Sequence, residues 1–263
     1  MAIRRTTRRR LVRMALYALF AVLVAVAALT ADWESLANNF LRLDIARDQF
    51  PQIITIALRN TLLFTVIAFA GGLLLGILLA LMKLSSIGPY RWFATAYIEL
   101  FRGLPALLTI FAISFMLPIA FGVRVPFAPA GGALVGLIAV AGAYMAEVIR
   151  AGIQAVPKGQ TEASRSLGMS PGKTMVFVTL PQGFRIIIPP MTNEFVLLLK
   201  DTSLVFIAGT TPLLKELTTY ARDQSSALGN STVLLMAALL YLVVTVPLTR
   251  VAAYLERRLA RSR

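Results

Sequence analysis

The chain has neither cysteine nor histidine among its 263 residues, and only 14% of the residues are charged. Without cysteine and histidine the chain has no thiolate or imidazole chemistry, no disulfides, and none of the ligands that zinc and haem use most often. Soluble domains usually carry charge on about a quarter of their residues. The low charged fraction therefore excludes an ordinary soluble fold, and any catalysis would have to rest on carboxylates and hydroxyls.

Apolar residues dominate instead: 58% of the chain is hydrophobic and the mean hydropathy is +0.77. Five uncharged runs, each long enough to cross about 30 Å of hydrocarbon as a helix, occupy residues 14–31, 60–82, 103–123, 125–146 and 224–249. A sixth span at residues 186–208 is needed if successive loops are to alternate between the two sides of the membrane. The sequence thus predicts an all-α integral membrane protein with six transmembrane helices.

The chain has a net charge of +14, and its Lys and Arg residues cluster at the ends of these apolar runs. This placement is typical of a membrane protein rather than of a nucleic-acid-binding protein. With the N-terminus inside, the inner segments hold seventeen Lys and Arg residues, whereas the outer loops at 32–52, 121–130 and 209–230 hold five. This asymmetry predicts a multi-pass membrane protein with both termini in the cytoplasm. The six arginines before the first run resemble the start of a signal peptide. We interpret this run as a retained signal anchor, with its processing as the alternative.

The span at 186–208 is the least apolar of the six, because it contains Glu194, Lys200 and Asp201. Ionisable groups at membrane depth are costly unless they face a bundle interior or a water-filled cavity. We therefore expect this helix to line a pathway. The alternative is a shorter helix that starts after Pro190 and leaves Lys200 and Asp201 near the outer surface.

The inner loop at residues 150–184 is the largest hydrophilic piece of the chain and contains no run long enough to insert. Its local signals predict two short helices. In chain order these signals are a turn at 157–159, a helix over 160–167, Gly168 as its C-cap, Ser170 as the next N-cap, Pro171 at the first position of the second helix, and Pro181 where that helix ends or kinks.

An ordered helix-turn-helix between two membrane helices suits the docking of a soluble partner. Ala163 and Leu167 share one helix face, and Ala163 and Ser164 are small enough to admit a partner's side chains closely. The alternative is a helix that lies on the inner leaflet, which would suit the basic residues Lys158, Arg165 and Lys173.

A spaced motif runs through this loop: Glu162-Ala163-Ser164, then three residues, Gly168, nine residues, and residues 178–181 with the sequence Val-Thr-Leu-Pro. It resembles the EAA loop of the permease subunits of ABC importers, E-A-A-x3-G-x9-I-x-L-P. The chain departs from that pattern at Ser164, where the second Ala is usual, and at Val178, where Ile is usual.

Other stretches are similar to one branch of that family, the polar amino acid permeases. They are residues 97–105, with Leu104 in place of the more usual Thr, residues 143–153, Pro157, residues 159–160, residues 180–182 and residues 200–204. The likeness extends from about residue 55 to the C-terminus. The resemblance therefore implies a type I permease domain with a five-helix core over residues 51–263, to which residues 1–50 add a basic N-terminus, one further transmembrane helix and an outer loop.

The resemblance also implies a place in the bacterial cell membrane and a set of partner proteins. A second permease subunit, identical or related, would complete the pathway, a dimer of ABC ATPase subunits would bind beneath it, and an extracytoplasmic binding protein would deliver a polar amino acid of the glutamine/glutamate or basic type. The chain contains no phosphate-binding G-x-x-x-x-G-K-[ST] loop, so ATP and Mg would be held by the ATPase and this subunit would not be an enzyme.

Two sets of candidate site residues follow from the resemblance. The coupling set, expected to contact the ATPase, is Gln160, Glu162, Ala163, Ser164, Leu167 and Gly168. The pathway set, which offers the donors and acceptors that an α-amino acid needs, is Arg102, Asn193, Glu194, Lys200, Asp201, Thr202 and Ser203. Glu147 is a weaker candidate, because it lies close to Arg150 near the inner face.

Each charged candidate also has a purely structural interpretation. Arg102 would pair with Glu99, Lys200 with Asp201 or Glu194, and Glu162 with Arg165.

Three functional alternatives also remain. One is a secondary transporter or channel that needs no ATPase, the second is a membrane-embedded enzyme, which the scattered acidic residues disfavour, and the third is an ABC permease for another small polar solute.

Overall fold

Helix is the only regular secondary structure in the part of the chain that the structure describes, residues 5–122 and 125–260 of a computed structural model. The prediction of an all-α protein is confirmed. Five residues used in the predictions, Arg4, Val123, Arg124, Arg261 and Arg263, lie outside the described residues. The α-helices are α1 (Arg5–Thr30), α2 (Trp33–Phe40), α3 (Leu43–Gln52), α4 (Arg59–Leu84), α5 (Gly88–Gly103), α6 (Ala106–Phe121), α7 (Ala130–Gln154), α8 (Lys158–Ser166), α9 (Pro171–Thr174), α10 (Leu180–Asp201), α11 (Leu217–Leu228) and α12 (Thr232–Ala260).

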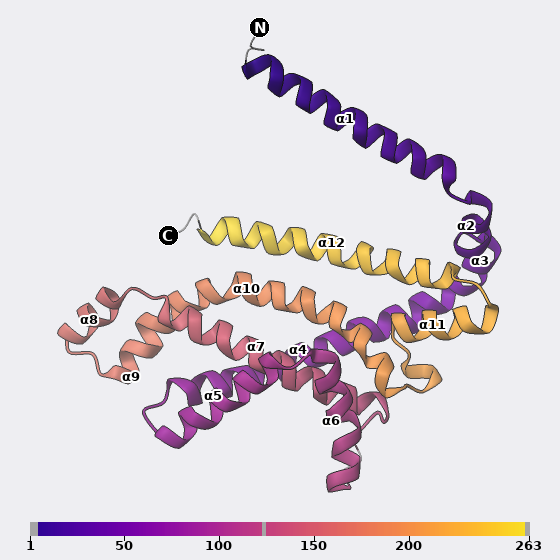
Figure 1. The fold of residues 1–263 in the computed structure, drawn as a ribbon. Helices are drawn as coiled ribbons and strands as arrows, with labels where there is room; N and C mark the ends of the chain where they lie inside the picture. Colours follow the sequence, from indigo (N-terminus) through magenta and orange to yellow (C-terminus); the bar gives the residue numbers. More distant parts are fainter. Residues whose placement is uncertain (1–4, 123–124, 261–263) are drawn as a thin grey trace.

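Helix α7 forms the centre of the bundle, and α4, α5, α6 and α10 all pack against it (Figure 1). In the most apolar stretch of α7, 72% of the residues are buried inside the protein. Small residues bring α4 and α7 close together: a Cβ added to Gly72 would lie 2.8 Å from the Cβ of Ala141, and one added to Gly76 would lie 2.9 Å from that of Met145. Such close backbone approach favours helix association in lipid, where apolar side chains gain little by leaving the solvent.

Four helical stretches are long and apolar enough to cross a membrane, namely Arg9–Thr30, Trp33–Leu84, Ala130–Gln154 and Thr232–Leu259. Helices α5 and α6 together make a fifth candidate, although they meet at an angle of 112°. A multi-pass membrane protein is thus confirmed, but the predicted count of six spans is not. The predicted third span shortens to α6, because the chain turns sharply at Leu104 and Pro105 before it.

The predicted span at 186–208 corresponds to α10 and the 3-10 helix η3 (Thr202–Ala208) that follows it. Helix α10 begins at Leu180 and runs through Pro189 and Pro190, so the alternative of a helix that starts after Pro190 is wrong. Pro181 ends no helix either, because the π-helical stretch η2 (Met175–Thr179) joins α9 directly to α10; the alternative of a kink at Pro181 stays a prediction. The irregular turn absorbs the missing amide of Pro181 and keeps the backbone helical.

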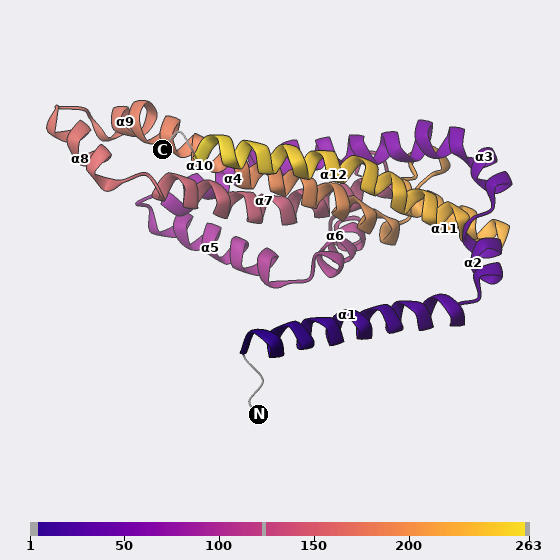
Figure 2. The same cartoon turned by 90° about the horizontal axis from the view of Figure 1, so that it is seen from above.

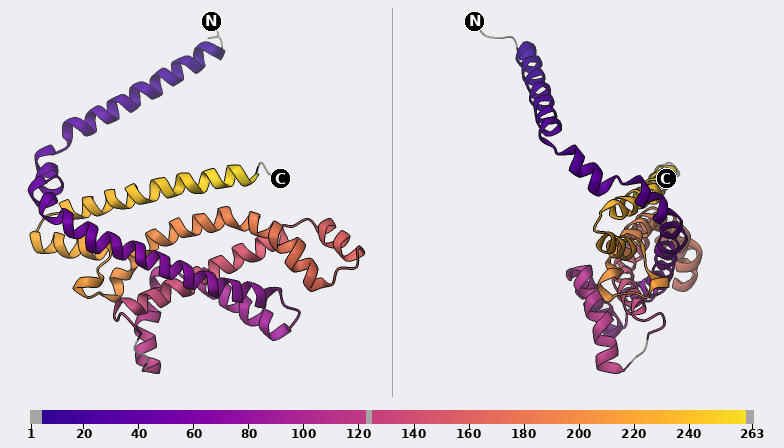
Figure 3. Two further views of the ribbon diagram at one scale, coloured as in Figure 1. Left: turned by 180° about the vertical axis from the view of Figure 1, so that it is seen from behind. Right: turned by 90° about the vertical axis from the view of Figure 1, so that its right-hand side faces the viewer.

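Helix α1 stands apart from the bundle (Figures 1 and 2). Its apolar side chains from Leu11 to Leu29 are largely exposed. The segment that follows α1 is held against the bundle, because it is hydrogen-bonded at the start of α12: the amide of Ser231, just before α12, donates to the carbonyl of Asn39 in α2 at 2.9 Å, and that of Arg42, just after α2, to Oγ1 of Thr232 at 3.1 Å. Figure 3 shows α1 leaving the bundle from this point. Helix α3 crosses residue 50, where the added segment was predicted to end, and that boundary stays a prediction.

A buried carboxyl group organises the turn before α11. The side chain of Glu216 is fully buried and caps α11, accepting hydrogen bonds from the amides of Thr218 at 2.6 Å and Thr219 at 2.7 Å. The side-chain amide of Asn60 on α4 donates to the carbonyl of Lys215, the residue before Glu216, at 3.0 Å. Burial raises the pKa of Glu216 above its ordinary 4.5, although these hydrogen bonds act in the opposite direction.

Candidate functional site

The loop at 150–184 forms a helical hairpin that projects from one end of the bundle, as the sequence predicts (Figures 1 and 2). Helix α8 occupies residues 158–166, close to the predicted 160–167, and Gly168 after it has φ +85°, a left-handed conformation that costs other residues about 1–2 kcal/mol. Ser170 caps α9 by accepting a hydrogen bond from the amide of Lys173 at 3.3 Å, and Pro171 follows at the first helical position. The predicted caps are confirmed, whereas the predicted turn at 157–159 is not, because Lys158 and Gly159 already belong to α8.

Most of the coupling set lies on the outside of this hairpin. The exposed members are Gln160, Glu162, Ala163, Leu167 and Gly168. Leu167 is 84% exposed, which is unusual for a leucine that no membrane run contains. The hairpin thus offers a small polar and apolar surface at its tip.

Ser164 does not belong to that surface. Its side chain is 5% exposed, its hydroxyl donates to the carbonyl of Thr161 at 2.8 Å, and it is hydrogen-bonded to the hydroxyl of Thr174 on α9 at 3.0 Å. The expectation that Ser164 admits a partner's side chains is therefore wrong. It faces inward because it lies one residue, or about 100°, around the helix from exposed Ala163.

The structural interpretation of Glu162 is also wrong. Within the described residues Glu162 forms no ion pair with Arg165, whose guanidinium donates instead to the carbonyl of Met169. Glu162 is thus an exposed carboxylate on the face of α8 that points away from α9.

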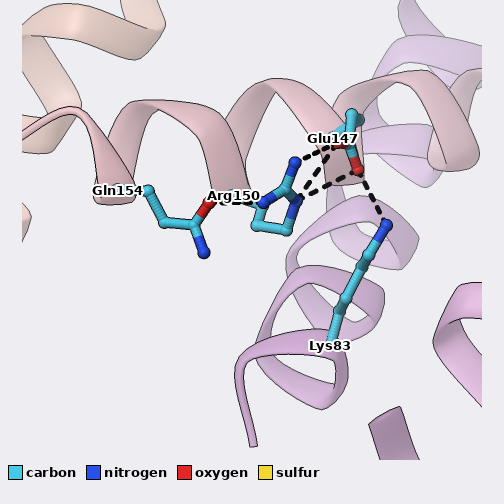
Figure 4. A network of polar contacts seen from close by, with 4 residues as sticks. All are labelled: Lys83, Glu147, Arg150 and Gln154. Carbon is cyan, nitrogen blue, oxygen red and sulfur yellow. Dashed lines mark hydrogen bonds and ion pairs between the residues drawn. The ribbon is translucent and has the colours of Figure 1, made fainter. Parts of the chain in front are cut away.

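An ion-pair network holds the base of the hairpin (Figure 4). Glu147 on α7 accepts a hydrogen bond from Nζ of Lys83 on α4 at 3.1 Å and from Nε of Arg150 at 3.2 Å, and Arg150 also donates to Gln154. Glu147 is partly buried, so its charge is compensated on both sides. Its expected proximity to Arg150 is confirmed. The network ties α4 to the last turns of α7, from which the hairpin leaves.

Part of the pathway set comes together where α5, α7 and α10 meet. The guanidinium of Arg102, at the end of α5, lies over the ring of Tyr144 on α7, 5.4 Å from its centroid. Glu194 on α10 interacts electrostatically with both Arg102 and Asp201. Glu194 and Asp201 are seven residues apart and therefore share one face of α10. Glu194 of α10 thus lies within electrostatic range of a cation on α5 and of a second carboxylate on its own helix.

The predicted structural pairings of these charges do not take the form of ion pairs, although Lys200 interacts electrostatically with its neighbour Asp201. Arg102 forms no ion pair with Glu99, and Lys200 forms none with Asp201 or Glu194, among the ion pairs of the described chain. The cause is geometric for Arg102, since its side chain turns onto Tyr144 rather than along α5.

The other members of the pathway set are not part of this group. Asn193 faces α12, where it lines a cavity with Thr249. Thr202 is fully buried and its hydroxyl donates to the carbonyl of Leu199 at 2.6 Å, while Ser203 is half-buried beside it. Lys200 is exposed.

Tyr144 was not among the predicted site residues. It lies within the stretch 143–153 that carries the family resemblance, and it is 37% exposed on a helix whose neighbouring side chains are buried. The only signal in the sequence was a large aromatic residue in a run rich in Ala and Gly. Its contact with Arg102 of α5 becomes visible only in the structure.

A multi-pass helical membrane protein with an ordered hairpin at one end of the bundle is the class that this fold and site define. The family model described as "Binding-protein-dependent transport system inner membrane component" matches residues 72–261. The chain belongs to this family.

Individual relatives agree with the family. The chain is 42% identical over 205 residues to the "Probable glutamine ABC transporter permease protein GlnM" of Bacillus subtilis (strain 168), covering 77% of this chain and 91% of that protein. It is 37% identical over 212 residues to the "Arginine transport system permease protein ArtQ" of the same organism, covering 80% and 94%. A solved structure entitled "Crystal structure of an amino acid ABC transporter with histidines" matches with a TM-score of 0.73 and 37% identity, covering 82% of this chain and 97% of that one.

Proposed function

We propose that this chain is the permease subunit of an ATP-driven importer for a polar amino acid of the glutamine/glutamate or basic type. The similarity to permeases named for glutamine and arginine transport carries the substrate class. The group of Arg102, Glu194 and Asp201 supports it chemically. A guanidinium binds an α-carboxylate with two hydrogen bonds, and a carboxylate accepts from an ammonium group.

The partners follow from the family rather than from this chain. A second permease subunit, identical or related, forms the pathway with it, a dimer of ATPase subunits binds ATP and Mg, and an extracytoplasmic protein delivers the amino acid. Both termini and the hairpin face the cytoplasm in this proposal, because the basic residues are concentrated at that end of the bundle.

Helix α8 is the coupling element. When the ATPase subunits close on ATP, they move the hairpin through contacts with Glu162, Ala163 and Leu167, which are exposed. The Glu147 network ties α4 to the base of the hairpin, so the displacement reaches both helices together. The result is a rigid-body shift of the bundle between inward-open and outward-open states.

The decisive experiment separates coupling from assembly. Gly168→Asp and Glu162→Arg are expected to abolish uptake while the subunit remains in the membrane, and Ser166→Ala, on the same helix, is expected to leave uptake intact. Substrate-stimulated ATPase activity, measured on the reconstituted transporter, is expected to fall with uptake. Normal stimulation in both variants would contradict the assignment of α8.

The substrate group has its own test. Arg102→Ala and Glu194→Ala are expected to raise the substrate concentration needed for half-maximal transport and to change selectivity between acidic, neutral and basic amino acids. Glu34→Ala, which removes an exposed carboxylate from α2, serves as the control. Unchanged affinity and selectivity in the first two variants would remove those residues from the pathway.

A further inference from the structure

The packing of α5 on α7 fixes the positions from which Arg102 and Tyr144 meet (Figure 1). The hydroxyl of Tyr97 on α5 donates to the carbonyl of Ala139 on α7 at 3.1 Å. The ring of Tyr97 stacks on that of Phe101, with the two centroids 4.3 Å apart. Arg102 follows Phe101 directly, so its backbone is held at a defined height along α7.

The backbone around Tyr144 is held closely by α4. A Cβ added to Gly142 would lie 2.7 Å from Cδ2 of Leu75, and one added to Gly76 would lie 2.9 Å from the Cβ of Met145. These contacts lie two residues before Tyr144 and one residue after it. The residues on either side of Tyr144 are buried, whereas Tyr144 itself is exposed. It therefore presents a ring on a backbone that has little room to shift.

Arg102 has carboxylates close by and pairs with none of them. Glu99 precedes it by three residues on the same face of α5, a spacing that brings two Cβ atoms to about 5–6 Å. Glu194 on α10 lies within electrostatic range of it. Neither carboxylate forms an ion pair with Arg102 in the described part of the chain. The guanidinium lies instead over the ring of Tyr144, 5.4 Å from its centroid, which is within the reach of a cation–π contact.

A ring and a carboxylate differ in what they leave of the cation. A carboxylate would neutralise the guanidinium and occupy two of its N–H donors in a bidentate pair. A tyrosine ring attracts the cation through its quadrupole and carries no charge of its own. Arg102 is therefore held in place while its charge and its donors stay free for an incoming carboxylate.

We propose that Tyr144 is the positioning residue that keeps Arg102 available for the α-carboxylate of the transported amino acid. It holds the guanidinium on a neutral ring, away from Glu99 and Glu194. This inference rests on the proposed function, in which Arg102 binds that carboxylate. Without the ring, the guanidinium turns to a carboxylate of its own chain and has to be released from it before a substrate can bind.

The inference specifies which part of the substrate depends on Tyr144. Every α-amino acid brings the same carboxylate to Arg102, and Tyr144→Leu leaves the net charge of the site unchanged. This variant should therefore weaken the binding of neutral and of basic amino acids by the same factor. An amine that lacks the carboxylate should bind to the wild type and to the variant alike, which a general disturbance of the site would not allow.

The test measures ligand binding to the purified complex of this subunit with its ATPase, in detergent and without the binding protein, so that only the membrane site selects. The probes are L-glutamine and L-arginine, with their decarboxylated counterparts 4-aminobutanamide and agmatine. The wild type is expected to bind at least one amino acid about tenfold more tightly than the matching amine, because charge-assisted hydrogen bonds hold the carboxylate. Tyr144→Leu is expected to weaken the binding of that amino acid about tenfold and to leave the binding of the amine unchanged.

A conservative variant and a mutant cycle separate positioning from a structural role. Tyr144→Phe keeps the ring and is expected to bind the amino acid within about twofold of the wild type. In an Arg102→Ala background, Tyr144→Leu is expected to have no further effect, because Tyr144 acts through Arg102. Tyr144→Met takes the place of Tyr144→Leu if that complex is not recovered in a folded state.

The chain offers a matched control, a second cation–π contact outside this site. The ring of Phe206 lies 5.6 Å from the guanidinium carbon of Arg222. Phe206→Leu removes a ring from a contact of the same kind and is expected to leave the binding of both amino acids unchanged.

Three results would overturn the role of Tyr144 and leave the proposed function intact. The first is equal binding of the amino acid by the wild type and Tyr144→Leu. The second is a loss in Tyr144→Phe as large as that in Tyr144→Leu, and the third is a further loss in the Arg102→Ala background. A wild-type complex that binds neither amino acid overturns the inference as well, and it contradicts the proposed function only if uptake by the complete transporter is also absent.

Discussion

The hydroxyl groups of Ser164 on α8 and Thr174 on α9 are hydrogen-bonded at 3.0 Å, and both side chains are only 5% exposed. This contact joins the two arms of the hairpin across the turn that contains Gly168. A force applied to the exposed face of α8 is therefore passed to α9, and from there along a continuous helical backbone into α10. The exposed face of α8 is therefore available to a partner, whereas its buried face holds α8 against α9.

Ser164→Leu is expected to force α8 away from α9, because a buried site of this size has no room for three further carbon atoms. Overpacking of this kind costs about 1–3 kcal/mol. Uptake should fall strongly, whereas Ser164→Ala, which removes one hydrogen bond worth about 1 kcal/mol, should retain most of it. Ser166→Leu, at an exposed position of the same helix, is the control. Equal uptake by Ser164→Leu and Ser166→Leu would mean that the two arms do not act as one piece.

The face of α8 also shows how far sequence reasoning reached. Caps and turns are decided by a few neighbouring residues, so Gly168, Ser170 and Pro171 were predictable from their positions alone. Whether Ser164 faces a partner or α9 depends on where α9 lies, which is a tertiary matter. The sequence therefore predicted where α8 lies along the chain, but not that Ser164 faces α9.

The same distinction applies inside the bundle. Glu194 and Asp201 stood out as charges in an apolar span, and the structure places Glu194 within electrostatic range of both Arg102 and Asp201. Tyr144 had no charge to mark it, and its place beside Arg102 follows from the packing of α5 on α7. The sharp bend between α5 and α6 likewise could not be predicted from the uncharged run at 103–123, since hydropathy carries no information about the angle between helices.

Close packing between α6 and α7 makes Gly136 a sensitive position. A Cβ at Gly136 would lie 2.8 Å from the Cα of Ile110, so the backbone of α6 would have to move. Gly136→Ala is expected to lower thermal stability in detergent by an amount equivalent to about 1–3 kcal/mol. Gly88→Ala is the matched control, because no atom lies within 4 Å of the added carbon there. A melting temperature for Gly136→Ala equal to that of the control would show that α6 is not held in this position.

The Lys83–Glu147 pair can be measured by a double-mutant cycle. Lys83→Met leaves Glu147 with Arg150, and Glu147→Gln removes the charge that both cations share. Because both partners are about one-fifth exposed, we expect a coupling free energy of about 1–2 kcal/mol between the two sites. Thermal unfolding of the wild type, both single variants and the double variant gives this value. Additive effects would indicate that α4 and α7 are joined by packing alone.

The buried carboxyl group of Glu216 makes a prediction about pH. Because burial raises its pKa above the ordinary 4.5, the folded chain keeps this proton at pH values where the unfolded chain has lost it. The stability that this group contributes is therefore complete below about pH 4.5 and declines as the pH rises toward the raised pKa of the folded state. Glu216→Gln keeps an acceptor oxygen for the amide of Thr219 but cannot ionise, so its melting temperature should lack this decline. Glu34→Gln, which changes an exposed carboxylate on α2, should retain the wild-type decline.

Melting temperatures measured from pH 4 upward in the same detergent test this prediction. The contrary result is a wild-type stability that rises with pH relative to that of Glu216→Gln. It would mean that the hydrogen bonds from Thr218 and Thr219 outweigh burial, and that Glu216 is ionised in the folded chain.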